Sequence, residues 1–520
     1  MRPVHFVLVL LVASFVARGW MVSRVKAPWC DEGWFAAAAH NIAFAGHSGL
    51  PVEPTGFFLD QKLTGIQQHT FLVPPLHLWL LAGWYRVVGF GLDQTRMYGV
   101  LWGAAGLVVM FGLFQAIWRR PWLSLLAAAV CALDFVWLWA SADGRMDVAV
   151  MVLSLAGWWA WFYWRGNERG LVVAHACFAL ACLAHLNAVI SLAALWLMIL
   201  WRGRRGLSVR AIAWAAVPFA LAGVAWILYV DGHWDEFRTQ FVANARGHSA
   251  LGRVAASWQP WIEVLDELIT RYFAAFGLKP FWLHATPPLY PLVVLIPFGA
   301  AFTVLFQGRP WRGRGGGLLL MAFAQIGVYA LFVRFKAHNY LAYLMPLWSM
   351  LLALFLWRWW HRAGARRFVA VMVASVWVAM QLFTFTWKLR QPDRAEFEEL
   401  AQYLRRTPFP ADAYLSGPTL LVFGVGYGRW VEDNRIGLRS GRRPDVVVLD
   451  SYAREFETVL VAGEPDVWLA YLKSFREEYR PLRRVGPYEV WVRRAPEIQA
   501  STGIQISKPP SPVRASNAAP

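Results

Sequence analysis

The chain has 520 residues, of which 58% are hydrophobic and 16% are charged, and its formal net charge is +18. A soluble domain is about 45–50% apolar and about 25% charged, so soluble multidomain enzymes and disordered or fibrous proteins are excluded. Several apolar runs reach the roughly 20 residues that a helix needs to cross a bilayer, and the sequence therefore predicts a polytopic membrane protein.

We predict eleven membrane-spanning helices and no cleaved leader. The first apolar run is similar to the core of a signal peptide, but no small-x-small cleavage site precedes Trp20 and many further runs follow it. An uncleaved first helix is therefore expected. The predicted spans cover residues 4–22, 97–118, 122–140, 147–164, 171–187, 188–201, 211–230, 288–306, 317–333, 340–360 and 368–387.

The arginines indicate the orientation of these helices and explain the positive charge without a nucleic-acid partner. They fall in five loops that follow alternate spans, so all five loops can face the cytoplasm, as basic loops generally do. The loops at 23–96 and 231–287, and everything after residue 388, then lie outside. The basic loops contain Arg119 and Arg120; Arg165 and Arg169; Arg202, Arg204, Arg205 and Arg210; Arg309, Arg312 and Arg314; and Arg358, Arg362, Arg366 and Arg367.

Two further helices are predicted inside the first external loop. The apolar stretch Pro74–Gly91 must have both of its ends outside, is near the short limit for a span, and carries His77 and Arg86. These features favour a helix that lies in the membrane interface. The stretch Gly33–Ala45 repeats its apolar residues at helical spacing and is predicted to be a second interfacial helix.

The region after residue 390 changes from apolar runs to a mixed pattern. We divide the chain into a membrane module of residues 1–390, an external α/β domain of residues 391–496, and a Ser/Pro/Ala-rich tail of residues 497–520 that is predicted to be disordered. Within the α/β domain, the pattern predicts helices over 393–406 and 465–480 and strands at Leu420–Val425, Val446–Leu449, Thr458–Val461 and Tyr488–Val492.

Three acidic residues on the predicted external face are candidates for catalysis. Asp31 and Glu32 stand between the first span and the next helix, where they could cap that helix or supply a general base at the membrane surface. The two roles are compatible, because a cap fixes the position of the carboxylate. Asp147 opens a span just after Arg145, and an ionisable group at membrane depth is a functional-site candidate. A helix cap with an internal Asp–Arg pair is the alternative.

Basic, imidazole and aromatic groups gather on the same predicted face. Fixed cations beside acids at a membrane surface suit chemistry on a phosphate ester whose leaving group is anionic. An ordinary charged loop with snorkelling side chains, and structural histidines, are the alternatives. No HExxH or CxxC spacing predicts a metal site. The candidate substrate-binding residues are Lys62, His69, Arg145, His185, Arg334, Lys336, His338 and Tyr340.

The Asp31–Glu32 pair after the first span, the Pro-Pro-Leu helix later in that loop, and Asp147 after an arginine together resemble the GT-C glycosyltransferases of the family 39 type. That group includes protein O-mannosyltransferases, lipid A aminoarabinose transferases and rhizobial galacturonosyltransferase-like proteins. The YLMP run at Tyr343–Pro346 is similar to their late Y-x-x-P segment. The resemblance covers about residues 1–390 and implies an all-α GT-C membrane module with two juxtamembrane helices.

By similarity, the protein would be an enzyme of the bacterial inner membrane. It would move a sugar from a polyprenyl-phosphate donor to a hydroxyl of lipid A or lipopolysaccharide, another envelope glycan or a protein, on the periplasmic side and with inversion. The resemblance implies that Asp31 deprotonates the acceptor, with Glu32 and Asp147 shaping the site.

The resemblance leaves the group that holds the donor phosphate open. The aminoarabinose transferases carry a lysine before the proline of the Pro-containing helix, but Val73 stands at that position here. Lys62, Arg334 or Lys336 is therefore expected to contact the donor phosphate. No cofactor is predicted, and a divalent cation is left open.

Two other classes of membrane protein are alternatives. A transporter or flippase for lipid-linked glycans would favour internal repeats and polar groups at the membrane midplane, whereas the ionisable groups here lie near one face. An O-antigen ligase or polymerase would rely on Arg and His rather than on an Asp-Glu pair.

The predicted external domain carries basic residues that suggest an anionic acceptor such as a lipopolysaccharide core. A solvated basic face is the ordinary alternative. These residues are Arg429, Arg435, Arg439, Arg442 and Arg443.

Overall fold

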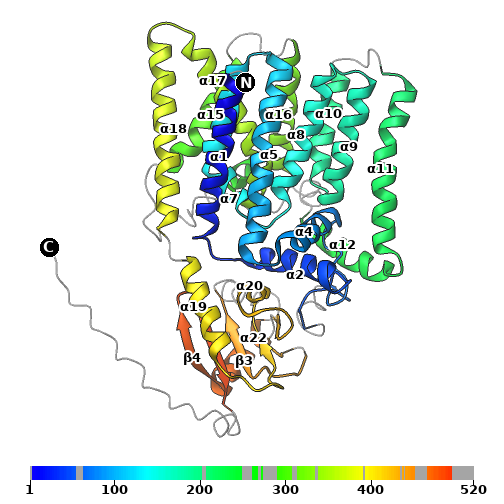
Figure 1. Cartoon of the computed structure of the whole chain (residues 1–520), viewed down its shortest axis with the longest axis vertical. Coiled ribbons are helices and arrows are strands. Elements are labelled where there is room, and N and C mark those ends of the chain that lie inside the picture. The colour runs from blue at the N-terminus through cyan, green and yellow to red at the C-terminus, as the bar shows by residue number, and fades with distance from the viewer. Residues whose placement is uncertain are drawn as a thin grey trace, which may run out of the picture.

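The computed structural model describes residues 3–53, 63–201, 207–248, 260–267, 271–272, 290–306, 313–333, 338–390, 393–433, 436–438, 440–450 and 465–494. Long helices lie side by side in one bundle, α2, α4 and α12 lie across one end of it, and a small α/β unit follows beyond them (Figure 1). The bundle contains α1 (Pro3–Ser23), α5 (Leu92–Trp118), α6 (Pro121–Leu133), α7 (Phe135–Ser141), α8 (Asp147–Tyr163), α9 (Glu168–Ala184), α10 (Ala188–Trp201), α11 (Val209–Val230), α15 (Tyr290–Phe306), α16 (Gly313–Phe332), α17 (Met345–Trp360) and α18 (Ala365–Leu389).

Every apolar run that was predicted to span the membrane contains a helix. By length and composition, four helices of the described residues are able to cross a membrane, namely α1, α5, α11 and α18, and the bent pair α6–α7 would add a fifth. α8, α10 and parts of α15 and α16 are shorter apolar helices. A mostly helical, apolar architecture is therefore confirmed, while the number of eleven spans stays a prediction.

The predicted span 122–140 is broken in the structure. α6 and α7 meet at Asp134 with a bend of 66°. The Asp134 side chain accepts a hydrogen bond from Trp137 N at 2.8 Å, which is an N-cap contact that starts a new helix. Phe135 N donates instead to Gln381 Oε1 of α18 at 2.7 Å, so the backbone group released by the break has a partner.

The two helices predicted inside the first external loop are confirmed as helices. They are α2 (Cys30–Phe44) and α4 (Leu76–Val88), and α12 (Trp234–His248) lies at the same end of the bundle (Figure 1). Asp31 and Glu32 fall in the first turn of α2, where negative charge favours the helix N-terminus. Pro75 is the N-cap of α4, and its ring holds φ close to the helical value directly before the first helical residue. The placement of α2 and α4 in a membrane interface stays a prediction.

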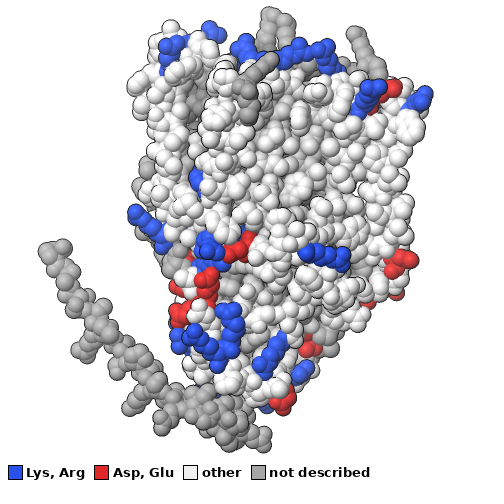
Figure 2. Space-filling view, in the orientation of Figure 1, with Lys and Arg blue, Asp and Glu red and all other residues white. Residues whose placement is uncertain are grey.

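Charged side chains are sparse on the visible sides of the bundle and gather near its two ends (Figure 2). Lys and Arg line the end that faces away from the α/β unit, where Arg119 and Arg120 follow the last turn of α5. Acidic groups appear mainly toward the opposite end, near the α/β unit. This asymmetry is the one on which the predicted orientation rests.

The α/β unit is built on a five-stranded sheet of order β2-β1-β3-β5-β4. β1 pairs in parallel with both β2 and β3, whereas β5 runs antiparallel to β3 and to β4. Phe397, Leu400 and Leu404 on one face of α19 are buried against this sheet in a core of their own. The elements are α19 (Asp393–Arg406), β1 (Leu415–Ser416), η4 (Thr419–Leu421), α20 (Val422–Val425), β2 (Trp430–Val431), β3 (Val446–Leu449), α22 (Pro465–Glu478), β4 (Tyr479–Val485) and β5 (Tyr488–Arg493).

Sequence patterns predicted four of these nine elements, namely α19, β3, α22 and β5, and missed the strands β1, β2 and β4. The helix at 393–406 and the strands at 446–449 and 488–492 are confirmed, and the helix predicted at 465–480 is confirmed as far as Glu478, where β4 begins with the next residue. The strand predicted at Leu420–Val425 is wrong, because this run forms the two short helices η4 and α20. A short apolar run has no period that separates a strand from a buried helical turn. The strand predicted at Thr458–Val461 and the tail of residues 497–520 lie outside the described residues.

The α/β unit packs directly against α2. Trp34 Nε1 donates to Glu432 Oε2 at 2.9 Å, and Glu432 N donates to Pro51 O at 2.8 Å. Gly33 faces η4 so closely that a Cβ at this position would lie 2.6 Å from Leu420 N. The helix that carries Asp31 is therefore held between the bundle and the α/β unit.

Candidate active site

The loop between α7 and α8, residues 142–146, contacts three other helices at Gly144. Gly144 N donates to Glu32 Oε1 of α2 at 3.2 Å, and Gly144 O accepts from His77 Nε2 of α4 at 3.1 Å. A Cβ at position 144 would collide with the side chain of Thr95 on α5. Only glycine allows this approach, and the loop is therefore fixed between α2, α4 and α5.

Arg145 connects two of the predicted acidic residues. Its Nε donates to Asp147 Oδ2 at 2.8 Å, and its Nη1 forms an ion pair with Asp31 Oδ2. The side chains of Arg145 and Asp147 are 8% and 4% exposed, whereas that of Asp31 is 37% exposed. Asp31 is thus held by a buried cation but remains accessible, which suits a carboxylate that acts on a substrate.

Glu32 points away from this opening into the protein. Both of its carboxylate oxygens accept from Arg96 of α5, at 2.9 Å from Nε and 2.8 Å from Nη2, and both side chains are 0% exposed. Arg96 also donates to the backbone oxygens of Ser23, at the end of α1, and of Lys26 and Ala27, between α1 and α2. Burial raises the pKa of Glu32, but the charge and hydrogen bonds of Arg96, the charge of Lys26 and the hydrogen bond from Gly144 N together outweigh burial and lower it.

A second buried ion pair lies beside this one. Lys26 Nζ pairs with Asp143 Oδ1, and the two side chains are 9% and 6% exposed. The ammonium group also lies 4.5 Å from the ring centroid of Trp139. Burial lowers the pKa of Lys26 and raises that of Asp143. Asp31, Glu32, Asp143 and Asp147 are therefore each paired with a cation, and Asp31 has the most exposed carboxylate of these four acids.

The described imidazoles near this site have structural partners. Burial lowers the pKa of His77 to about 4, so the ring that binds Gly144 O is neutral at pH 7. His185, at the end of α9, accepts a hydrogen bond at Nδ1 from Asn187 N at 3.1 Å and lies near enough to His77 to affect its charge. Tyr340 lies in the 3-10 helix η3 (His338–Tyr343), which precedes α17. It is buried and interacts electrostatically with Asp147 and Arg145.

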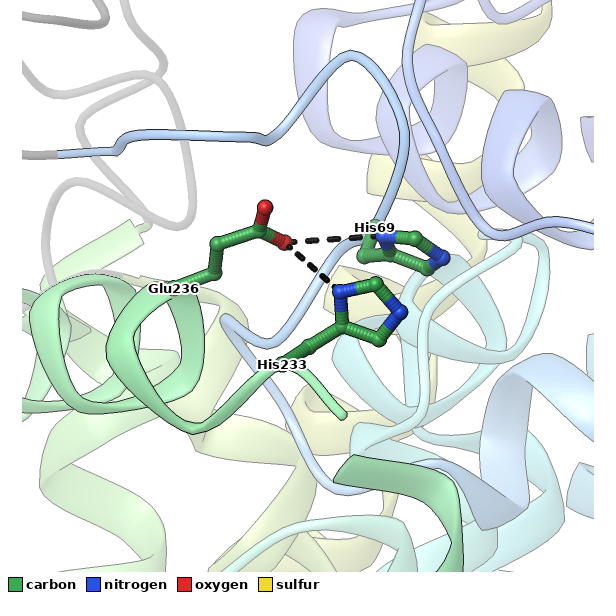
Figure 3. Close-up of side chains that lie close together, drawn as sticks. All are labelled: His69, His233 and Glu236. Carbon is green, nitrogen blue, oxygen red and sulfur yellow. Dashed lines mark ion pairs between the residues drawn. The ribbon is translucent and has the colours of Figure 1, made fainter. Parts of the chain in front are cut away.

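His69 belongs to a separate cluster. Its ring lies against that of His233, with 3.7 Å between the centroids, and both rings face the carboxylate of Glu236 at the start of α12 (Figure 3). The predicted residues Lys62, Arg334 and Lys336, and the side chain of His338, lie outside the described residues. Their assignment to the donor phosphate stays a prediction.

The basic residues of the α/β unit make contacts within it. Arg429 Nη2 donates to Phe409 O at 2.8 Å, Arg442 lies 4.2 Å from the ring centroid of Tyr414, and Arg443 lies 4.4 Å from that of Tyr471. Arg435 and Arg439 are outside the described residues. The three described arginines therefore have an internal role, which weakens the case for an acceptor site built on them.

Sequence reasoning missed four residues that the structure places at these two clusters. Lys26 and Arg96 flank spans on the predicted external face. Basic residues next to spans are usually on the cytoplasmic side, so their position on the external face is a signal that could have identified them. His233 and Glu236 stand one helical turn apart at the start of α12, a spacing that places two ligands on one face. Their relation to His69 could not be read from spacing.

Comparison with known proteins gives the fold. The sequence matches no protein-family model and no curated protein sequence. Among solved structures, the oligosaccharyltransferase of Archaeoglobus fulgidus tethered with an acceptor peptide is 11% identical, with a TM-score of 0.55 over 92% of this chain and 72% of that one. ArnT from Cupriavidus metallidurans bound to undecaprenyl phosphate is 16% identical, with a TM-score of 0.50 over 93% of this chain and 97% of that one. The chain therefore has the fold of the GT-C glycosyltransferases.

Proposed function

We propose that the protein is an integral membrane glycosyltransferase that moves a sugar from a polyprenyl-phosphate donor to a hydroxyl acceptor. The reaction would take place at the end of the bundle where α2 and α4 lie, which the charge bias predicts to be the periplasmic face of a bacterial inner membrane. The observation that carries the proposal is Asp31, a partly exposed carboxylate fixed by Arg145 on the first helix outside the bundle. The fold, shared with a transferase bound to undecaprenyl phosphate, supports the choice of donor.

In the proposed reaction, Asp31 removes the proton of the acceptor hydroxyl. The acceptor oxygen attacks the anomeric carbon of the sugar, the bond from that carbon to the phosphate oxygen breaks, and the lipid phosphate leaves with the bonding electrons. Attack from the side opposite to the phosphate inverts the anomeric centre. Asp31 Oδ2 pairs with the Arg145 cation, whereas Oδ1 accepts a weak hydrogen bond from the Cys30 thiol, with 3.6 Å between Sγ and Oδ1, so Oδ1 is the oxygen proposed to take the proton.

The buried groups around Asp31 position it. Arg145 is shared between Asp31 and Asp147, and Asp147 lies within the bundle at the start of α8. The shared arginine therefore fixes the Asp31 carboxylate relative to the bundle and leaves Asp31 Oδ1 for the substrate. Glu32 holds the turn before α2 through Arg96 and, being fully buried, shapes the site without touching substrate.

Replacing Asp31 with Asn tests the proposal. A general base contributes about 10²- to 10⁴-fold to a rate, so we expect a loss of that size in transfer of labelled sugar from the membrane polyprenyl-phosphate pool to envelope acceptors. The acceptor is identified first, by comparing the glycan profiles of source cells with and without the gene.

The control is Asp231→Asn, which removes an exposed carboxylate at the end of α11 and should leave transfer unchanged. Transfer that survives Asp31→Asn unchanged would remove Asp31 from the mechanism. If instead the gene alters the distribution of lipid-linked sugar across the membrane and no glycan, the transport alternative is correct and the enzyme proposal fails.

A further inference from the structure

We propose that His69, His233 and Glu236 bind a zinc ion that fastens the first external loop to the start of α12. This proposal does not depend on the proposed function, because the three residues lie outside the Asp31 cluster. His69 comes from the loop before α4, while His233 and Glu236 stand at positions i and i+3 at the N-terminal end of α12 (Figure 3).

The three ligand atoms converge on a common point. Glu236 Oε2 lies 3.5 Å from His69 Nδ1 and 3.6 Å from His233 Nδ1, and all three ligand atoms are within 4.8 Å of one another. These separations are too long for good hydrogen bonds. They fit two ligands of one tetrahedral ion, because Zn–N and Zn–O bonds of about 2.0–2.2 Å place such ligands about 3.3–3.6 Å apart.

Two of these ligand atoms are buried polar atoms without a hydrogen-bond partner among the described residues. They are His69 Nδ1 and Glu236 Oε2. A buried polar atom without a partner is costly, and an unfilled ligand is one explanation for it. A cation at the common point would satisfy both atoms together with His233 Nδ1.

The surrounding residues hold the two segments in place. Gln240, which is 0% exposed, donates from Nε2 to Thr64 O at 2.8 Å and to His69 O at 3.0 Å, and it accepts from Phe71 N at 2.8 Å. A Cβ at Gly65 would collide with the carboxylate of Glu236. The loop that carries His69 is therefore bound to α12 on both sides of the cluster, so the site is built before a metal arrives.

The donor set selects the kind of metal. Two imidazoles and one carboxylate match a three-ligand zinc site with a fourth position for water, whereas Mg²⁺ and Ca²⁺ prefer oxygen ligands only. His69 Nδ1 and Glu236 Oε2 are themselves buried, but the side chains of His69, His233 and Glu236 are 25%, 35% and 27% exposed, so the cluster lies close to solvent. The fourth position can therefore take a water molecule.

Metal content of the purified full-length protein tests this proposal directly. The protein is prepared in detergent without a histidine tag, stripped with a chelator, loaded with ZnCl₂ and passed over a desalting column. We expect one zinc per chain by elemental analysis. His233→Ala and Glu236→Gln should each weaken zinc binding by about tenfold or more, since changes beyond the ligands themselves cost about 10–100-fold at other metal sites.

Two matched controls separate this site from general metal uptake. Asp235→Asn removes the exposed carboxylate next to Glu236, and His361→Ala removes an exposed histidine just after α17. Both should keep one zinc per chain. Equal zinc content in wild type, His233→Ala and Glu236→Gln would show an adventitious ion only and overturn the proposal.

A second measurement needs no variant and so does not depend on whether the variants fold. Zinc that binds the folded chain must raise its melting temperature, and the increase should saturate at one equivalent. Co²⁺ in place of zinc should give the intense visible absorption of a four-coordinate site. A melting temperature that does not respond to zinc, with no such absorption, would mean that Glu236 forms an ordinary ion pair with the two imidazoles.

Discussion

Asp31 and Glu32 are adjacent in the sequence, yet they occupy environments that suit different roles. The side chain of Asp31 is 37% exposed and shares Arg145 with Asp147, whereas Glu32 and its partner Arg96 are 0% exposed. Consecutive residues of a helix point about 100° apart, so one can face an opening while the next faces the bundle. A pair motif therefore does not give its two members the same function.

This difference predicts opposite effects of substitution. Glu32→Gln leaves the Arg96 guanidinium buried without a countercharge, and breaking a buried pair in this way costs about 3–5 kcal/mol. We expect a clear loss of thermal stability for Glu32→Gln, measured in detergent by the unfolding of the purified protein. Asp31→Asn, at a half-exposed position, should change the melting temperature little while removing activity.

The comparison between the two variants provides the check. If Asp31→Asn lowered the melting temperature as much as Glu32→Gln, then Asp31 would be a structural residue and its loss of activity would carry no information on catalysis. If Glu32→Gln were fully stable but inactive, then Glu32 would act on the substrate in some way that its buried position does not suggest.

At the scale of elements, α2 connects the α/β unit to the candidate active site, because it carries Asp31 and also contacts that unit. The N-terminal end of α2 carries Asp31, and Gly33 and Trp34, two and three residues later, contact η4 and Glu432. Farther along the helix, the ring of His40 stacks on that of Tyr427 with 4.7 Å between centroids. A shift of the α/β unit would therefore move the helix on which the proposed base sits.

Gly33→Ala should weaken this contact. The new Cβ would lie 2.6 Å from Leu420 N, and backbone cannot move aside as a flexible side chain can. Overpacking of this kind costs about 1–3 kcal/mol. We expect the α/β unit to separate from α2 more often and trypsin to release it about fivefold faster or more, because cleavage follows the population of the opened form.

Gly83→Ala is the matched control. Gly83 also lies in a helix of the same end of the bundle, but a Cβ there would have no atom within 4 Å, so the change should leave the α/β unit as protected as in wild type. Equal cleavage rates in wild type and Gly33→Ala would show that the contact between α2 and η4 contributes nothing to docking.

The elements that the sequence predicted well are those whose signal is local. Apolar runs of bilayer length, the two helices of the first external loop, and the amphipathic pattern of α19 all depend on residues a few positions apart. The break at Asp134 combines a local N-cap contact with a distant partner, Gln381, and the helical turns at 420–425 lie against Gly33 of α2. Local patterns hold no information on such partners.

The same limit applies to the sites. Asp31, Arg145 and Asp147 could be picked as candidates because charged residues near spans are rare. The pairing of Glu32 with Arg96 and of Lys26 with Asp143 could not be predicted, since it depends on how α1, α2 and α5 meet. His69 was selected as a substrate ligand, whereas the structure places it beside His233 and Glu236, far along the chain.

At the scale of the whole molecule, one asymmetry connects topology and function. Lys and Arg line the end of the bundle away from the α/β unit, and the Asp31 cluster lies toward the opposite end (Figures 1 and 2). If basic loops face the cytoplasm, then the proposed base, the zinc cluster and the α/β unit all lie on the outer side. The proposed donor must then present its sugar on that side.

Single-cysteine labelling tests this orientation. In a background with Cys30, Cys131, Cys177 and Cys182 replaced by serine, we introduce Asp412→Cys in the α/β unit or His361→Cys after α17, both at exposed positions. In intact spheroplasts a membrane-impermeant maleimide should label Asp412→Cys fully and His361→Cys only after the membrane is opened with detergent.

The reverse labelling pattern would place the Asp31 cluster in the cytoplasm. Nucleotide-activated sugars are soluble there, so the need for a lipid-linked donor would disappear, and the proposed reaction would lose its physical reason. Labelling of both cysteines in intact spheroplasts would instead mean that the α/β unit and the loop after α17 lie on the same side of the membrane, so that α18 is not a single span between them. The proposed role of Asp31 with a lipid-linked donor therefore depends on the orientation that the charge distribution predicts.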